Sequence, residues 1–421
     1  MRFRNSLKIA VVFAAALGLY ATSAGVTLNY GSLAPHYIHL AYSLLRGHVD
    51  LVKLPPVAYD LLVYQGKWFV AGSPLPAILL MPFVAAWGLW MSDIPFGVVV
   101  GALNVALIYD LLGSVQVSSS ARRWLTALFA AGTVHWYAAV VGSYWLNAHV
   151  VAVLFVTLYV RETLSRGRGW LAGLWLALAV LARPTVMFGA AFFGAWTWQQ
   201  QRAARPFLRA VLPFGLALAL GVAIHLAYNA VRFGSPLDFG YAYVHGAENI
   251  TDMYARYGGF NLSFVPRNLY VSLLCPPYIL PRFPFLQPNP WGMSLFLTTP
   301  AFLYLFRTFR RKPLIVASWV GLLCVMIPLW MYHNTGSLQF GYRYSLDVAP
   351  FLLLLTACGM FPQIADLKHP ASNVEAMGKI NLLQGGLIII SILVNWAGMA
   401  WMFKHFNGFG WMAMWYHLVV K

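Results

Sequence analysis

Charged residues are scarce in this chain of 421 residues. They make up 9% of the sequence, whereas hydrophobic residues make up 60%; soluble domains carry about 25% charged residues. This balance excludes an ordinary soluble domain and predicts an all-α polytopic membrane protein. Acids are the rarest charged residues, with 11 Asp and Glu against 28 Lys and Arg. Any acid in a polar loop is therefore a candidate for chemistry.

The sequence also lacks the motifs of several protein classes. Its cysteines, Cys275, Cys324 and Cys358, show no CxxC or metal-site spacing. It has no GxxxxGK[ST], HExxH or GxSxG motif, so nothing indicates an ATP-driven pump, a zinc protease or a serine hydrolase. The basic residues fall between apolar stretches and form no basic face with interleaved aromatics, so we expect no nucleic acid partner. We also expect no metal and no other cofactor.

Apolar stretches follow one another along most of the chain. After a first run that ends near Leu28, they lie at roughly 74–92, 95–118, 124–141, 144–161, 169–182, 184–199, 207–229, 291–306, 313–332, 344–361 and 381–403. We expect one integral membrane domain, residues 1–421, with about 11 to 13 transmembrane helices in a lipid bilayer. The last residues, 404–421, are expected to form an aromatic interfacial tail.

Basic residues in short loops predict the orientation of the chain, because cytoplasmic loops are enriched in Lys and Arg. Placing the clusters inside puts three polar loops outside: a first outer loop at 29–73, a second at 231–290 and a short one at 333–343. The clusters are Arg2, Arg4 and Lys8; Arg122 and Arg123; Arg161, Arg166 and Arg168; Arg202, Arg205 and Arg209; Arg307, Arg310, Arg311 and Lys312; Lys368 and Lys379.

The first outer loop is the expected place for catalysis. The segment PHYIHLAYSLL, residues 35–45, has helical spacing of apolar residues and predicts an interfacial helix. Asp60, with Lys67 close by, stands just before the chain re-enters lipid, where a base can deprotonate an acceptor. Asp60 is therefore the first candidate base and Asp50 the second. The alternatives are a solvated Asp60 paired with Lys67 and an Asp50 that caps the following turn.

Further candidates lie at the outer ends of apolar stretches. Asn147 and His149 in GSYWLNAHVV either line a donor site or make helix contacts, because polar groups at membrane depth need a partner or a cavity. Arg183 precedes a proline between two apolar stretches, and it either binds a lipid phosphate or snorkels to the interface. Arg343, beside Tyr342 in QFGYRYSLD, either binds phosphate or pairs with an acid four residues later.

The motifs that carry a family resemblance occur in order along roughly residues 8–361. They are HYIHLAYSLLRGHVDL, YDLLVYQGKWFVAGSPLPAILLMP, GSYWLNAHVVAVLF, LARPTVM, YNAVRFGSPLDFGY, WGMSLFLTTPAFL and GSLQFGYRYSLDVAPFLLLL. Together they resemble the polyprenyl-phosphate-sugar-dependent glycosyltransferases of the GT-C fold, near the protein-mannosyltransferase and aminoarabinose-transferase branches. The resemblance implies a GT-C-like helical bundle, a polyprenyl-phosphate-linked sugar donor and an unidentified acceptor.

The sequence departs from this family at one important position. Family members carry an acid a few residues before the tyrosine of the first interfacial helix, and here Leu33 and Ala34 occupy that place. Either Asp50 or Asp60 has taken over, or the chemistry differs, or the chain catalyses no transfer.

The leading hypothesis is an inverting glycosyltransferase in a bacterial inner or plasma membrane, with its active site facing outward. Arg183 and Arg343 are expected to hold the donor phosphate, with His149, Asn147, Lys67 and Tyr342 as further substrate-binding candidates. A non-catalytic binder or transporter of polyprenyl-linked saccharides is the alternative. A secondary transporter is a third possibility, for which Asp110 in ALNVALIYDLL is the one good mid-helix acid.

Overall fold

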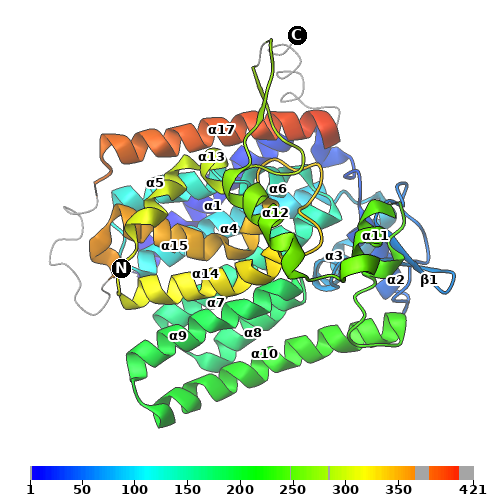
Figure 1. The fold of residues 1–421 in the computed structure, drawn as a ribbon, viewed down its shortest axis with the longest axis horizontal. Coiled ribbons are helices and arrows are strands. Elements are labelled where there is room, and N and C mark those ends of the chain that lie inside the picture. Colours follow the sequence, from blue (N-terminus) through cyan, green and yellow to red (C-terminus); the bar gives the residue numbers. More distant parts are fainter. Residues whose placement is uncertain (1, 247, 283–284, 366–378, 407–421) are drawn as a thin grey trace.

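The structure, a computed structural model, describes residues 2–246, 248–282, 285–365 and 379–406, and in these ranges it is mostly helical (Figure 1). Six described helices are long and apolar enough to cross a membrane, and they confirm the expected all-α polytopic membrane fold. They are α1 (Arg2–Ala24, continued by η1, Gly25–Asn29), α4 (Ile94–Ser114), α7 (Tyr144–Ser165), α10 (Ala204–Phe233), α14 (Pro313–Trp330) and α17 (Leu382–Phe406).

The sequence predicts about 11 to 13 transmembrane helices. In the described residues, six helices are long and apolar enough to cross a membrane, or seven if one bent pair counts as a single span. The other apolar stretches form shorter helices, because prolines and tight turns interrupt them. The bent pair, α5 and α6, changes direction by 50°. The shorter helices are α3 (Leu75–Trp87), α5 (Ser119–Ala131), α6 (His135–Val141), α8 (Gly169–Val180), α9 (Ala190–Gln201) and α15 (Ala349–Met360).

Small residues let neighbouring helices approach closely. Helix α10 packs along α8, and a Cβ on Gly221 would lie 2.5 Å from the Cβ of Ala177. A Cβ on Gly173 would lie 2.3 Å from the carbonyl oxygen of Phe214. Such contacts are typical of helices that pack in a membrane, where van der Waals contact replaces the hydrophobic drive.

The first loop folds into a helix and a hairpin with a small core of their own. Helix α2 (His36–Leu44) confirms the helix expected at residues 35–45. Strands β1 (Leu61–Tyr64) and β2 (Lys67–Val70) pair antiparallel, which the sequence reading did not predict. The signal was present, because Gln65 and Gly66, both with positive φ, form a two-residue turn between strand-forming residues.

The second loop lies against the first. An isolated bridge joins Leu62 to Val244, and the backbone N–H of His245 donates to the carbonyl of Leu61 at 2.8 Å. Figure 1 accordingly places α2, β1 and α11 at the same end of the molecule. The elements of this region are η4 (Tyr241–Tyr243), α11 (Glu248–Tyr257), η5 (Leu262–Phe264), α12 (Val265–Leu269), η6 (Tyr270–Leu274), β3 (Tyr278–Ile279) and β4 (Leu286–Gln287).

The remaining described elements connect the long helices. They are η2 (Gly88–Trp90), η3 (Pro184–Gly189), α13 (Leu295–Thr298), η7 (Pro300–Arg307), η8 (Arg343–Val348) and η9 (Pro362–Ala365). Every residue of α15 is buried, so this short helix fills the interior rather than facing lipid. The expected aromatic tail lies, from residue 407 onward, outside the described residues, as does Lys368.

Candidate active site

A cavity of about 420 Å³ lies where the two loops meet the first turns of α7 and the last turns of α10. The break between α8 and η3, and the segment from Tyr332 to Tyr344, complete its wall. Four residues singled out in the sequence line it: Asp60, His149, Arg183 and Arg343. The fold therefore brings together side chains that are up to 283 residues apart, which is 343 minus 60.

Asp60 reaches the cavity from the turn that precedes β1. Its backbone has φ 63°, a left-handed conformation that Asp tolerates better than most residues. One carboxylate oxygen, Oδ2, accepts a hydrogen bond of 3.0 Å from the indole N–H of Trp145. Burial raises the pKa of the Asp60 carboxyl, while the Trp145 N–H and the charge of Arg343 act in the opposite direction. A carboxylate with a raised pKa is better matched to general base catalysis near neutral pH.

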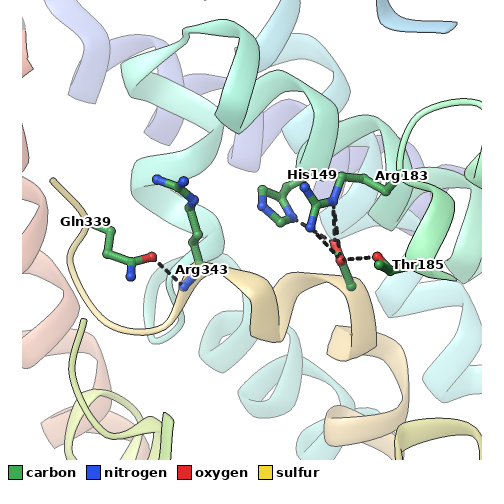
Figure 2. A network of polar contacts seen from close by, with 6 residues as sticks. His149, Arg183, Thr185, Gln339 and Arg343 are labelled. Carbon is green, nitrogen blue, oxygen red and sulfur yellow. Dashed lines mark hydrogen bonds and ion pairs between the residues drawn. The ribbon is translucent and has the colours of Figure 1, made fainter. Parts of the chain in front are cut away.

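His149 and Arg183 meet at a buried carboxylate, Asp347 (Figure 2). The Nδ1 of His149 lies 2.8 Å from Asp347 Oδ1, and Arg183 Nη2 donates to Oδ2 at 2.9 Å. The hydroxyl of Thr185 donates to the same Oδ2 at 3.2 Å. Because an ionised carboxylate only accepts hydrogen bonds, the imidazole donates from Nδ1. This carboxylate thus fixes both cavity-lining side chains and joins α7, η3 and η8.

Arg343 does not form the pair with Asp347 that its spacing allowed. Its Nη1 donates to the carbonyl of Ser337 at 3.1 Å, and its backbone N–H donates to Gln339 Oε1 at 3.2 Å. In Figure 2 its guanidinium points away from His149 and Arg183. Within the described part of the chain it forms no salt bridge, and its buried Nε has no hydrogen-bond partner. This cation is available to an anionic ligand.

Three other predicted site residues lie away from the cavity. Lys67 and Asp50 approach each other, with Nζ 3.8 Å from Oδ1, and the Lys67 side chain is 63% exposed. Lys67 therefore does not pair with Asp60. Tyr342 is fully buried, and its ring packs at right angles against Tyr344, which does line the cavity.

The last predicted residue, Asn147, faces a buried acid that sequence reasoning missed. Asp93 accepts from the backbone N–H and hydroxyl of Ser32 at 2.9 and 2.7 Å, and from the backbone N–H of Ser143 at 3.3 Å. Asn147 Nδ2 lies 3.4 Å from the same carboxylate. Asp93 thus contacts Ser32, the residue before Leu33, where the family acid is expected, yet it does not line the cavity. Its position directly before a helix was the available signal.

Helix α10 supplies two further lining residues, Arg232 and His225, and sequence reasoning missed the second of them. They lie in or next to the apolar stretch 207–229, and polar side chains in such a stretch usually face a cavity or a partner. Asp110, the acid considered for a transporter, instead accepts a hydrogen bond from Arg161 near the other end of α4. In the described ranges no three His, Cys, Asp or Glu side chains gather in a metal-binding group.

Comparison with solved structures identifies the fold. The chain is similar to the Archaeoglobus fulgidus oligosaccharyltransferase tethered to an acceptor peptide with an NVT sequon, with a TM-score of 0.50 and 12% identity over 93% of this chain. It spans 54% of that structure, about half its length. The apo form of the same enzyme gives a TM-score of 0.46 at 12% identity, over 97% of this chain and 60% of that one. No family model matches the sequence, and no curated protein matches it.

The chain has the GT-C fold of this oligosaccharyltransferase. Together with the six apolar helices, it defines the chain as a multi-pass integral membrane protein in a lipid bilayer.

Proposed function

We propose that the chain is a membrane glycosyltransferase that moves a monosaccharide from a polyprenyl-phosphate donor to an acceptor outside a bacterial inner or plasma membrane. One observation carries this proposal: a base candidate, Asp60, and an arginine with no acidic partner among the described residues, Arg343, face the same cavity. The likeness to an oligosaccharyltransferase that was captured with an acceptor peptide supports the same class of reaction. The loop charges support the outward orientation.

In the proposed reaction the acceptor hydroxyl or amine attacks the anomeric carbon of the donor sugar from the face opposite the phosphate. Asp60 takes the proton of the acceptor as the new bond forms. The bond between the anomeric carbon and the phosphate oxygen breaks, and its electron pair leaves with the lipid phosphate. Arg343 stabilises the growing negative charge, and so does Arg183, whose own charge is partly balanced by Asp347.

A non-catalytic binder or transporter of polyprenyl-linked saccharides is the second candidate. The observation that favours it is Leu33, which lines the cavity with an apolar side chain at the place where the family carries its acid. The binder requires the cationic groups of the cavity and does not require Asp60.

The test is transfer of a radiolabelled sugar from polyprenyl-phosphate donors to membrane acceptors by the purified chain and its Asp60→Asn variant. Loss of the base should slow transfer about 100-fold or more, because general base catalysis contributes roughly 10² to 10⁴. Asp252→Asn, an exposed acid outside the cavity, is the matched control. Full activity in Asp60→Asn would move the base elsewhere, with Asp50→Asn as the next variant. Donor binding without transfer would favour the binder.

The unfolding temperature of the Asp60→Asn variant distinguishes the loss of a catalytic base from the loss of the fold. Because burial raises the pKa of Asp60 in the folded state, its protonated form is favoured there. Its contribution to stability is therefore fully present below its unfolded pKa and is lost as the pH rises through the folded value. At pH 7 the Asp60→Asn variant should unfold at the same temperature as the parent chain or a higher one.

A further inference from the structure

Besides Arg343, three buried side chains that line the cavity carry polar atoms without a hydrogen-bond partner among the described residues. Tyr37, His225 and Arg232 line the cavity and are 1%, 4% and 5% exposed. Within the described residues, no hydrogen bond reaches the Tyr37 hydroxyl, either ring nitrogen of His225, or Arg232 Nε. Buried polar groups are nearly always satisfied in native proteins, so three such side chains on one cavity call for a ligand.

All three groups can donate hydrogen bonds, and one carries a fixed charge. Arg232 is held by neutral acceptors: its Nη1 donates to the carbonyl of Val70 at 2.9 Å and its Nη2 to Asn229 Oδ1 at 2.7 Å. It forms no salt bridge to a described acid. Burial raises the pKa of the Tyr37 hydroxyl, while the charges of Arg183 and Arg232, which line the same cavity, act in the opposite direction. Convergent donors with excess positive charge are the chemistry that binds phosphate.

The position of Tyr37 depends on a residue without a side chain. A Cβ on Gly72, which also lines the cavity, would lie 2.2 Å from the Tyr37 hydroxyl oxygen. The absence of that Cβ leaves the hydroxyl its place at the cavity wall. The backbone at Gly72 therefore helps to form the site.

Helix α10 separates this donor group from the apolar exterior. One face of the helix carries exposed apolar side chains over about four turns: Leu208, Leu212, Leu216, Leu220 and Ile224. His225, the next residue after Ile224, is buried and faces the cavity. Figure 1 shows α10 at the edge of the molecule. A ligand with a phosphate at His225 and an apolar chain on the outer face of α10 would match the polar face and the apolar face of this helix.

We propose that Tyr37, His225 and Arg232 form a phosphate subsite that holds the phosphate of an isoprenoid lipid, with the isoprenoid chain against the apolar face of α10. The inference rests on the proposed function for the role of this lipid as the sugar donor. It adds α2 and α10 to the phosphate contacts assigned to Arg183 and Arg343.

Two substitutions remove only the unpartnered atoms. Tyr37→Phe keeps the ring that packs edge-on against Tyr144, and His225→Phe keeps the ring that stacks on Phe239. Neither variant loses a hydrogen bond within the described protein. Tyr304→Phe is the matched control, because the Tyr304 hydroxyl is also buried and unpartnered but lies outside the cavity.

The experiment is calorimetric titration of the full-length chain in detergent micelles with farnesyl phosphate, farnesol and inorganic phosphate. Tyr37→Phe and His225→Phe should each weaken farnesyl phosphate binding roughly tenfold or more, as expected for a lost hydrogen bond to a charged group. Farnesol should bind these variants as it binds the parent chain, and Tyr304→Phe should bind farnesyl phosphate normally.

Unchanged farnesyl phosphate binding in both variants, or an equal loss in Tyr304→Phe, would overturn the subsite. Inorganic phosphate that binds as tightly as farnesyl phosphate would overturn the assignment to a lipid. Failure of the transferase proposal looks different: the two variants lose farnesyl phosphate binding, which supports the subsite, while the parent chain transfers no sugar.

Discussion

Trp145 donates a hydrogen bond to Asp60, the acid proposed as the base. Its indole N–H is the side-chain donor to Asp60 Oδ2, at 3.0 Å, and it lowers the pKa of a carboxyl that burial raises. Two residues along α7, Asn147 faces Asp93, and two residues further His149 contacts Asp347. Three side chains in the first two turns of one helix thus contact three different carboxylates.

Replacing Trp145 with Phe should move the acidic limb of the transfer rate to higher pH. The variant keeps an aromatic ring but loses the N–H that favours ionised Asp60, so the carboxyl stays protonated to a higher pH. The measurement is the rate of sugar transfer as a function of pH. Trp136→Phe is the matched control, because that indole donates instead to Ser23, away from the cavity. A uniform loss of rate at every pH would indicate a packing role only.

At the scale of elements, Asp347 holds three segments together. It lies in η8 and accepts hydrogen bonds from α7, through His149, and from the region of η3, through Arg183 and Thr185. The carboxylate is fully buried, whereas Arg183 remains 21% exposed at the cavity. The ion pair therefore fixes the geometry of the cavity wall while one side of the guanidinium stays open.

Asp347→Asn should destabilise the chain by about 3 kcal/mol, because breaking a buried ion pair leaves an uncompensated charge. The amide N–H groups of the substituted side chain would also face hydrogen-bond donors of His149, Arg183 and Thr185, and two donors cannot bond to each other. The measurement is denaturant-induced unfolding in mixed micelles. Asp50→Asn is the control, since it removes the exposed contact with Lys67, worth about 1 kcal/mol or less. Equal effects of the two substitutions would contradict the role given to Asp347.

At the scale of the whole molecule, the first and second polar loops close over one end of the helical bundle. The bridge between Leu62 and Val244 joins them, and Asp60 donates its backbone N–H to the carbonyl of His245 at 3.0 Å. The cavity lies beneath this junction, between the loops and the ends of α7 and α10. The orientation of the bundle therefore decides on which side of the membrane the cavity opens.

Cysteine labelling in intact cells should report the orientation. Lys67→Cys, on the exposed hairpin, should react with a membrane-impermeant maleimide, whereas Arg310→Cys should react only after permeabilisation, because the cluster around it is expected inside. Cys275 and Cys358 are buried and Cys324 is half-buried, so the native background should be low. The reverse pattern of labelling would place the cavity on the cytoplasmic side.

The sequence alone determined the membrane class, the helical fold, the α2 helix and four of the residues in the cavity, Asp60, His149, Arg183 and Arg343. These follow from composition, local periodicity and the cost of polar groups at membrane depth. The two-residue turn at Gln65 and Gly66, between strand-forming residues, was a further local signal, for the β1–β2 hairpin.

Only the tertiary structure decided which charges are neutralised and which remain open to a ligand. The sequence offered Arg343 as the partner of Asp347 four residues away, yet Arg183, 164 residues away, takes that place. Likewise Lys67 approaches Asp50 rather than Asp60, and Tyr37 of α2 lines the same cavity as His225 and Arg232 of α10. A charge pairs with whichever partner folding brings near in a low-dielectric interior, and that proximity depends on helix packing rather than on local spacing.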